Sequence, residues 1–325
     1  MHPQLRAWAQ LVRVPNTLTA CADVIAGFTL ATGAWWHIAG IWPSLLVASL
    51  ASICLYWAGM VLNDVHDVAE DTVQRRNGPL VRETVSVKTA SRAGWGLLAM
   101  GIGLAGASAY CLPASDVPAP YWVVAVTGAA LATTIVAYDS FLKATSVGPF
   151  LMGLCRGLNL LMGVALGACV NWPVDGAISL DWSSIGLATI GHVGFVMGIT
   201  LAARREGLLQ QSSLRLAMSW SVSVLGVAAI AMSSMWSTER PLYLDSHTWF
   251  PLFVSMLATP WLRRAVASIQ SPGMGTLVPA IKQAILSIIF LDAAIAVQFG
   301  GYLPGILVCG LAIPTFALSR IFRVT

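Results

Sequence analysis

Long apolar runs, separated by short polar segments, make up almost the whole chain. A run of about 20 apolar residues is long enough to cross the hydrocarbon core of a bilayer as a helix. The eighth run is short, and the last two are separated only by Gly301 and Tyr302. The pattern therefore predicts nine or ten membrane-spanning helices. The runs are Asn16–Trp36, Ile41–Leu62, Ala90–Leu112, Tyr121–Tyr138, Pro149–Val170, Ser183–Ala203, Leu216–Trp236, Trp249–Trp261, Ile281–Gly300 and Leu303–Ser319.

The composition also indicates an integral membrane protein. Hydrophobic residues account for 57% of the 325 residues and charged residues for only 10%, which excludes an ordinary soluble domain. We expect an all-α integral membrane protein, a helical bundle that forms one domain over residues 1–325. The six cysteines form no CxxC pair, so they predict neither a disulfide framework nor a zinc site.

The first 15 residues differ from the apolar runs that follow. Leu5, Trp8 and Leu11 give a short apolar face with Arg6 and Arg13 opposite, a pattern typical of a helix that lies in the membrane interface. No small-residue cleavage site follows this segment, so a cleaved signal peptide is not expected.

The basic residues predict the orientation in the membrane. If the N-terminus is cytoplasmic and the spans alternate, all 18 Lys and Arg residues except Arg240 fall at or near the inner face. Such a bias is the positive-inside rule. We therefore expect a multi-pass protein of the inner (plasma) membrane, whose helices contact the lipid bilayer. The net charge of +4 reflects this topology and does not indicate a nucleic-acid partner.

An acidic stretch follows the second apolar run directly. Four of the 14 acidic residues lie in it, at Asp64, Asp67, Glu70 and Asp71. If the preceding helix continues, Asp64, Asp67 and Asp71 share one face, where their charges repel. A divalent cation relieves that repulsion, and Mg²⁺ is usually held by a few carboxylates plus substrate phosphates. The stretch predicts a Mg²⁺ site in which these three aspartates are the metal ligands and the catalytic residues. The alternative is a solvated acidic loop beside the membrane.

Several polar residues lie inside the apolar runs, where they are costly unless they face a cavity or each other. Arg156 and Asn159 lie three apart on the fifth run, near the level at which the carboxylates emerge, so we expect them to line a site. For His192 and Asp292, a site and simple hydrogen bonding between helices both remain open. The full set is Asn16, Asp23, Arg156, Asn159, His192, Lys282 and Asp292.

The predicted cytoplasmic loops are basic. Arg76 and Arg82 follow the acidic stretch, and Lys143 and Arg204 lie in the next two loops on that side. Arg and Lys beside a carboxylate–metal site suit an anionic, phosphorylated substrate, although the same charges also serve topology. A metal-type carboxylate cluster, basic loops and an apolar bundle together fit a substrate with a diphosphate head and a long apolar tail.

The motif Asn63-Asp64-x-x-Asp67-x-x-x-Asp71 resembles the first aspartate-rich motif of the UbiA family of membrane prenyltransferases in every defining position. Further segments resemble the family over nearly the whole chain. They are Arg13-Val-Pro-Asn16, Arg76-Asn-Gly-Pro79, Tyr138-x-x-x-Leu142-Lys143 and Gly153-x-x-Arg156-Gly-x-Asn159.

The resemblance implies a bundle of nine or ten helices around a central cavity, capped by cytoplasmic loops. It also implies that the protein is an enzyme that transfers a prenyl group from a polyprenyl diphosphate to a small acceptor, often aromatic. Mg²⁺ on the first motif would neutralise the diphosphate, and the cavity would shield an allylic cation from water. The implied substrate-binding residues are Asn16, Asn63, Arg76, Arg82, Lys143, Arg156, Asn159, Arg204 and Glu206.

The family's second aspartate-rich motif is altered. Where that motif commonly has three aspartates, this chain has Leu201, Arg204 and Leu208, and only the glutamate, Glu206, is retained. This alteration resembles the EboC-like branch of the family. Either Arg204 contacts phosphate and a single ion suffices, or the protein binds or carries an isoprenoid without transferring it.

A third hypothesis is an unrelated transporter that uses Asp23, Arg156, His192 and Asp292 as a polar pathway. That hypothesis predicts that the aspartates of the first motif are dispensable.

Overall fold

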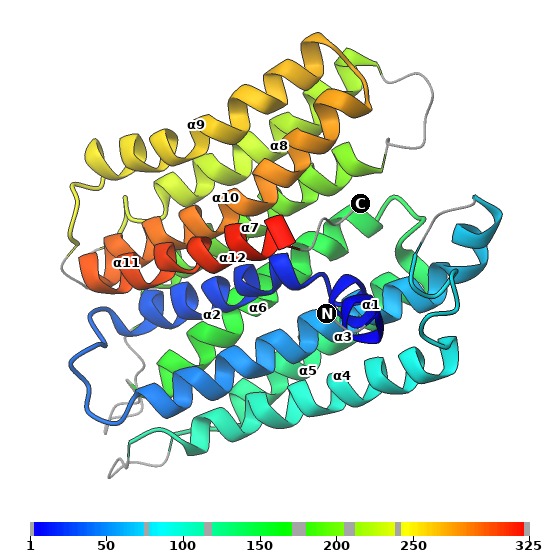
Figure 1. Cartoon of the computed structure of the whole chain (residues 1–325). Coiled ribbons are helices and arrows are strands. Elements are labelled where there is room, and N and C mark those ends of the chain that lie inside the picture. Colours follow the sequence, from blue (N-terminus) through cyan, green and yellow to red (C-terminus); the bar gives the residue numbers. More distant parts are fainter. Residues whose placement is uncertain are drawn as a thin grey trace.

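The structure is a computed structural model, which describes residues 3–74, 78–113, 119–170, 180–204, 212–237 and 242–321. Every regular element in these ranges is a helix (Figure 1), so the predicted all-α bundle is confirmed. The elements are α1 (Pro3–Leu11), η1 (Val14–Asn16), α2 (Thr17–Thr32), α3 (Trp42–Val73), α4 (Val87–Tyr110), α5 (Trp122–Ala137), η2 (Tyr138–Leu142), α6 (Gly148–Val170), α7 (Trp182–Ala203), α8 (Ser213–Met232), α9 (Trp249–Gln270), α10 (Met274–Gly300), α11 (Tyr302–Gly310) and α12 (Ala312–Ile321).

Within the described ranges, nine segments are long and apolar enough to cross a membrane. The helix α9 is not one of them, because Arg263 and Arg264 lower its mean hydropathy, yet it packs between α8 and α10 along the bundle (Figure 1). The predicted number of nine or ten spans is therefore confirmed.

Helix bounds differ from the apolar runs where polar residues form the first or last turns. The eighth run was expected to end at Trp261, but α9 continues to Gln270. The ninth was expected to begin at Ile281, but α10 begins at Met274, so Lys282 lies two turns inside the helix. Hydropathy locates the apolar middle of a helix and misses such polar ends.

The helices α2 and α6 form the centre of the bundle and touch backbone to backbone. A Cβ atom added to Gly27 of α2 would lie 2.0 Å from the Leu160 carbonyl oxygen, and one added to Gly163 of α6 would lie 2.1 Å from that of Val24. Small residues allow such close approach between membrane helices. Two hydrophobic clusters share this pair, one extending over α3, α4 and α5 and the other over α7 to α10.

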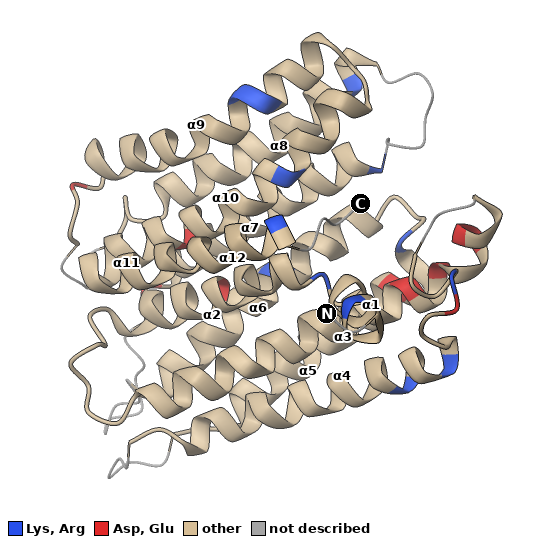
Figure 2. Ribbon diagram, in the orientation of Figure 1, with Lys and Arg blue, Asp and Glu red and all other residues tan. Residues whose placement is uncertain are grey.

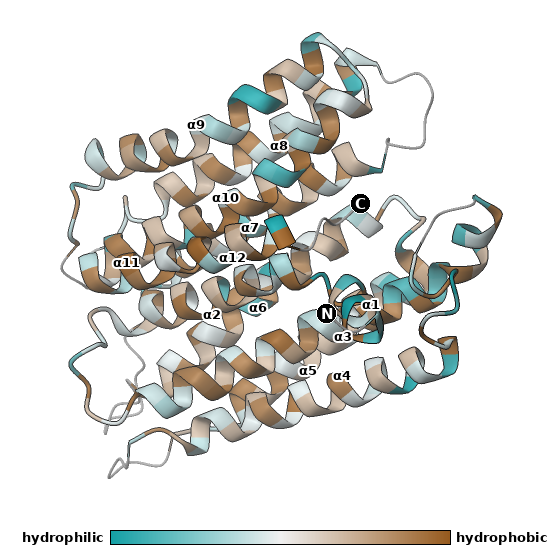
Figure 3. Cartoon of the chain, in the orientation of Figure 1, coloured by the Kyte–Doolittle hydropathy of each residue, from teal (hydrophilic) through white to brown (hydrophobic). Residues whose placement is uncertain are grey.

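Hydrophobic side chains cover the outside of the bundle as well as its core. Leu46, Ile190, Leu225 and Ile306 are each more than 60% exposed, and Figure 3 shows hydrophobic residues along the full length of the helices. A helical bundle that is apolar on both its inner and outer faces suits lipid as its solvent. The short helix α1 instead buries Ala7 and Leu11 against Val61 and Leu80.

Candidate active site

The acidic stretch forms the last turns of a long helix. The 32 residues of α3 give a length of about 48 Å, against about 30 Å for the hydrocarbon core of a bilayer. Helix α3 therefore projects beyond the other helices, and Figure 2 shows acidic residues gathered at its end. The helix continues through the acidic stretch to Val73, as expected, and Asn63 Nδ2 donates to Asp67 Oδ2, one turn further on, over 3.2 Å.

Lys143 joins this helix to the loop after α5. Its Nζ donates to Asn63 Oδ1 over 2.8 Å and also to the carboxylate of Asp67. Lys143 follows η2, a single π-helical turn, and such turns often occur at functional sites. At the end of α7, Arg204 Nη2 donates to the backbone oxygen of Lys143. The structure thus brings together four of the predicted residues, Asn63, Asp67, Lys143 and Arg204.

Arg13 completes the cationic side of this cluster. Its Nη2 lies 3.6 Å from Asp64 Oδ1. The backbone of Arg13 is left-handed, with φ 50°, an unfavourable conformation for a residue with a side chain. Such strain is commonly found at functional sites. Sequence reasoning placed Arg13 in a segment that resembles the family and not among the site residues; the available signal was a basic residue directly before a span.

A cavity of about 410 Å³ opens beside these charges, among α2, α3, α5, α6, α7 and α10. Its walls are mostly aliphatic, with a smaller number of polar groups, which is the usual composition of a small-molecule site. The predicted residues Asn16, Arg156 and Asn159 line it. Its other lining residues include Arg13, Ser52, Leu55, Tyr56, Met60, Leu131, Ile135, Tyr138, Asp139, Val196, Ile199, Thr200, Ile285 and Ile288.

Asp139 is a carboxylate that sequence reasoning did not assign to the site. It lines the cavity, is only 7% exposed, and its Oδ2 accepts no hydrogen bond from any described residue. Lys143, Asp67 and Arg13 all lie within electrostatic range of it. Asp139 therefore adds, from another helix, a buried carboxylate oxygen without a hydrogen-bond partner among the described residues, within electrostatic range of the first motif. The signal in the sequence was an acid at the polar end of the fourth apolar run.

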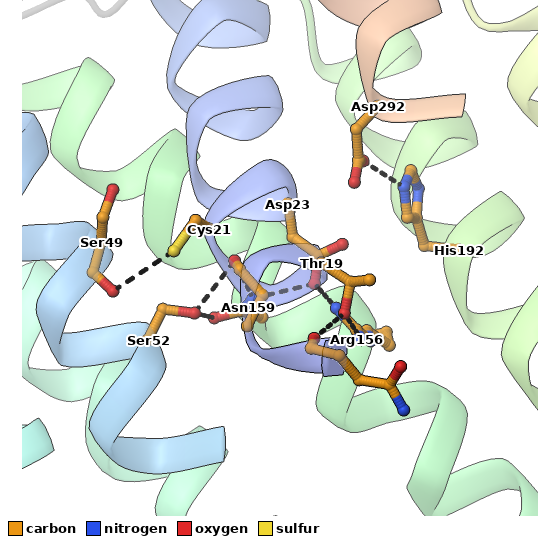
Figure 4. A network of polar contacts seen from close by, with 11 residues as sticks. Thr19, Cys21, Asp23, Ser49, Ser52, Arg156, Asn159, His192 and Asp292 are labelled. Carbon is orange, nitrogen blue, oxygen red and sulfur yellow. Dashed lines mark hydrogen bonds and ion pairs between the residues drawn. The ribbon is translucent and has the colours of Figure 1, made fainter. Parts of the chain in front are cut away.

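Arg156 and Asn159 are held by a buried network (Figure 4). Arg156 Nη1 lies 2.6 Å from Asp23 Oδ2, and Asn159 Nδ2 donates to the same oxygen over 2.8 Å. Asn159 Nδ2 also donates to the Ala20 carbonyl, and its Oδ1 accepts from Ser52 Oγ over 2.7 Å. The network ties α2, α3 and α6 together and fixes both polar side chains at the cavity wall.

The remaining predicted site residues do not line the cavity or lie outside the described residues. Asp71 lies on the last turn of α3, beyond the cavity lining. Arg82 is exposed, donates to Gln10 Oε1 over 3.3 Å and does not line the cavity. Arg76 and Glu206 lie outside the described residues.

The carboxylates at the end of α3 are the oxygen donors that a hard divalent cation prefers, although among the described residues no three of them bring their ligand atoms within 4.8 Å of one another. Asp64, Asp67 and Asp71 offer carboxylate oxygens from one helix, and Asp139 offers an unpaired oxygen from another. Mg²⁺ prefers oxygen ligands of this kind and retains positions for phosphate and water.

Comparison with known proteins agrees with this arrangement. A model of the UbiA prenyltransferase family matches residues 24–272. The chain belongs to the UbiA prenyltransferase family. The digeranylgeranylglyceryl phosphate synthase of Sulfolobus acidocaldarius is 27% identical over 162 residues, which are 49% of this chain and 52% of that protein. The corresponding synthase of Saccharolobus solfataricus is 32% identical over 100 residues, or 31% and 34% of the two chains. The chain thus spans about half the length, or less, of the curated relatives it matches.

Solved structures of UbiA proteins share the fold over almost the whole chain. A UbiA homologue from Aeropyrum pernix K1 superposes with a TM-score of 0.62 at 15% identity, covering 86% of this chain and 97% of the other. A homologue from Archaeoglobus fulgidus bound to GPP and Mg²⁺ superposes with a TM-score of 0.55 at 12% identity, covering 89% and 99%. These matches confirm the UbiA membrane fold.

Proposed function

We propose that this protein is a prenyltransferase that moves a prenyl group from a polyprenyl diphosphate to a small acceptor within the membrane. One observation carries the proposal. An apolar cavity opens beside a cluster that combines carboxylates, Asp67 and Asp139, with cations, Arg13 and Lys143. An amphiphile with a diphosphate head and an apolar tail matches both parts.

Each part of the site has a role in this reaction. Mg²⁺, held by Asp64, Asp67 and Asp71, would neutralise the diphosphate and assist cleavage of the C–O bond. Arg13 and Lys143 bind the leaving diphosphate, which departs with the bonding electron pair. The aliphatic walls exclude water from the allylic cation. The acceptor then forms the new bond to the prenyl carbon and releases a proton.

The relatives support the donor class. Two structures of a UbiA homologue from Archaeoglobus fulgidus were solved, one with GPP and Mg²⁺ and the other with DMAPP and Mg²⁺, and the matched synthases are named for digeranylgeranylglyceryl phosphate. We extend to this chain a polyprenyl diphosphate donor, Mg²⁺ and a small acceptor.

We place the protein in the inner (plasma) membrane, with its N-terminus and the site on the cytoplasmic side. Figure 2 supports this orientation, because Lys and Arg gather toward the end of the bundle where α3 projects. The positive-inside rule puts such an end in the cytoplasm.

A second candidate is an isoprenoid-binding or carrier protein without transfer. It is favoured by one observation, that Arg204 stands where the family's second motif has an aspartate and bonds to Lys143 instead of to a carboxylate. The two candidates predict the same donor binding and differ only in turnover.

The test is diphosphate release from geranylgeranyl diphosphate by the full chain in nanodiscs with Mg²⁺ and a panel of phenolic and glyceryl-phosphate acceptors. Prenyl transfer predicts release with at least one acceptor, lost in Asp67→Asn. Glu70→Gln is the matched control, because Glu70 lies on the same helix end but is exposed, and among the described residues its carboxylate accepts a hydrogen bond from Gln74 alone. Tight donor binding without release by any acceptor would favour the carrier.

A further inference from the structure

A second cluster of ligating side chains lies one helical turn deeper than the cavity. It consists of Asp23 on α2, His192 on α7 and Asp292 on α10, which are 0%, 2% and 0% exposed. One ligand atom from each lies within 4.8 Å of the other two, and Figure 4 shows the three side chains turned toward a common centre. None of the three lines the cavity, so the proposed transfer reaction does not account for them.

The surroundings of His192 fix its protonation pattern. Its Nδ1 lies 2.8 Å from the Ala188 carbonyl oxygen, which can only accept, so Nδ1 carries a hydrogen. Its Nε2 faces Asp292 Oδ1 at 2.8 Å. Histidines that bind metals usually donate one ring N–H to a carbonyl or carboxylate and ligate through the other nitrogen. His192 has this arrangement, with Nε2 directed at the two aspartates.

Two carboxylate oxygens in the cluster have no hydrogen-bond partner among the described residues. They are Asp23 Oδ1 and Asp292 Oδ2. Arg156 and Asn159 both bond to Asp23 Oδ2 and leave Oδ1 to the cluster. Buried polar atoms are nearly always satisfied, because an unpaired one retains its full desolvation cost. Two unpaired anionic oxygens at one point therefore indicate a missing cationic partner.

The missing partner must supply two positive charges and must contact both unpaired oxygens. A proton on His192 Nε2 satisfies Asp292 Oδ1 but leaves both unpaired oxygens facing each other. A second proton, on one of those carboxylates, would be needed to satisfy them. One divalent cation bound by His192 Nε2, Asp23 Oδ1 and Asp292 adds the same +2 charge and satisfies all three side chains at once.

We propose that Asp23, His192 and Asp292 bind one divalent transition-metal ion, in a site separate from the Mg²⁺ site on α3. An imidazole nitrogen together with carboxylate oxygens is a donor set typical of Zn²⁺ and not of Mg²⁺. The ion joins α2 to α7 and α10, three helices that contribute to one hydrophobic cluster of the bundle. Because Asp23 also holds Arg156, the ion fixes the position of a cavity-lining cation.

The test uses the full chain in detergent, stripped with a chelator and titrated with Zn²⁺, or with Co²⁺ as a spectroscopic probe, in excess Mg²⁺ that occupies the first motif. We expect about one ion per chain in the wild type, with an absorption spectrum of ligated Co²⁺. Losing a partner of a metal ligand already costs about 10–100-fold in affinity, so His192→Gln and Asp292→Asn should weaken binding at least about 100-fold. Asp67→Asn, which changes only the first motif, should bind as the wild type does.

X-ray absorption of the zinc-loaded wild type provides a check that does not depend on how the variants fold. It should show an imidazole ligand, since His192 would be the one nitrogen donor. Absence of a stoichiometric ion in the wild type would overturn the proposal and assign protons to the cluster. Loss of binding in Asp67→Asn with retention in folded His192→Gln would also overturn it, because the ion would then belong to the first motif.

Discussion

A single methyl group added at the contact between α2 and α6 should lower the stability of the fold substantially. In Gly27→Ala, the new Cβ atom would lie 2.0 Å from the Leu160 carbonyl oxygen, whereas ordinary contacts begin near 3.4 Å. The helices must therefore separate locally by the difference, about 1.4 Å. The 2.8 Å bond from Asn159 Nδ2 to the Ala20 carbonyl would then lengthen to about 4.2 Å, beyond the range of a hydrogen bond. Overpacking of this kind typically costs about 1–3 kcal/mol, and the broken bond adds to it.

The assay is thermal unfolding of the purified chain in detergent, compared with Gly103→Ala. Gly103 is an exposed position within α4, where a Cβ would meet nothing within 4 Å. Alanine there should be neutral or stabilise by about 0.5–1 kcal/mol, through helix propensity alone. We expect Gly27→Ala to melt several degrees below both the wild type and Gly103→Ala. If Gly27→Ala melted as high as Gly103→Ala, the close packing of α2 on α6 would be refuted.

Three further predictions concern single side chains. Asp139→Asn should raise the Mg²⁺ concentration for half-maximal activity about tenfold if its unpaired oxygen supports the ion; an unchanged Mg²⁺ titration would remove it from the site. Arg13→Gln should weaken geranylgeranyl diphosphate binding about 10- to 150-fold, since a hydrogen bond to a charged group contributes about 1.5–3 kcal/mol, whereas Arg82→Gln should have no effect in the same calorimetric assay. Burial alone would raise the pKa of Asp181, but hydrogen bonds from Ser183 and Ser184 at the start of α7 outweigh it and lower the pKa. Its ionised form therefore stabilises the fold above the ordinary pKa of aspartate, and this contribution is lost as the pH falls through the lowered value. Asp181→Ala should thus be less stable than the wild type at neutral pH by about 1 kcal/mol, with the difference in unfolding free energy narrowing in acid; the same pH dependence of stability in both proteins would contradict this.

The fold could be predicted from the sequence because lipid requires long apolar helices, and their length and hydropathy are local properties. The first motif could be predicted for the same reason, since Asp64, Asp67 and Asp71 belong to one continuing helix. The sequence did not show that Asp139 lines the cavity, because this depends on the π-helical turn that ends α5.

The buried cluster of ligating side chains shows more clearly which contacts cannot be predicted from the sequence. Asp23, His192 and Asp292 were visible as costly polar residues within spans, but they lie about 100 or more residues apart along the chain. Only the packing of α2, α7 and α10 brings their ligand atoms to one point. Sequence alone therefore left a site and simple hydrogen bonding equally open for His192 and Asp292.

The most direct test of the central claim is binding of geranylgeranyl diphosphate to the full chain, with and without Mg²⁺, in wild type, Asp67→Asn and Glu70→Gln. We predict binding that requires Mg²⁺ and is lost in Asp67→Asn but retained in Glu70→Gln, because Asp67 is a defining aspartate of the first motif and bonds to Lys143, whereas Glu70 occupies a variable position of the motif. Tight binding that is indifferent to both Mg²⁺ and Asp67 would contradict a carboxylate-held ion as the anchor of the diphosphate.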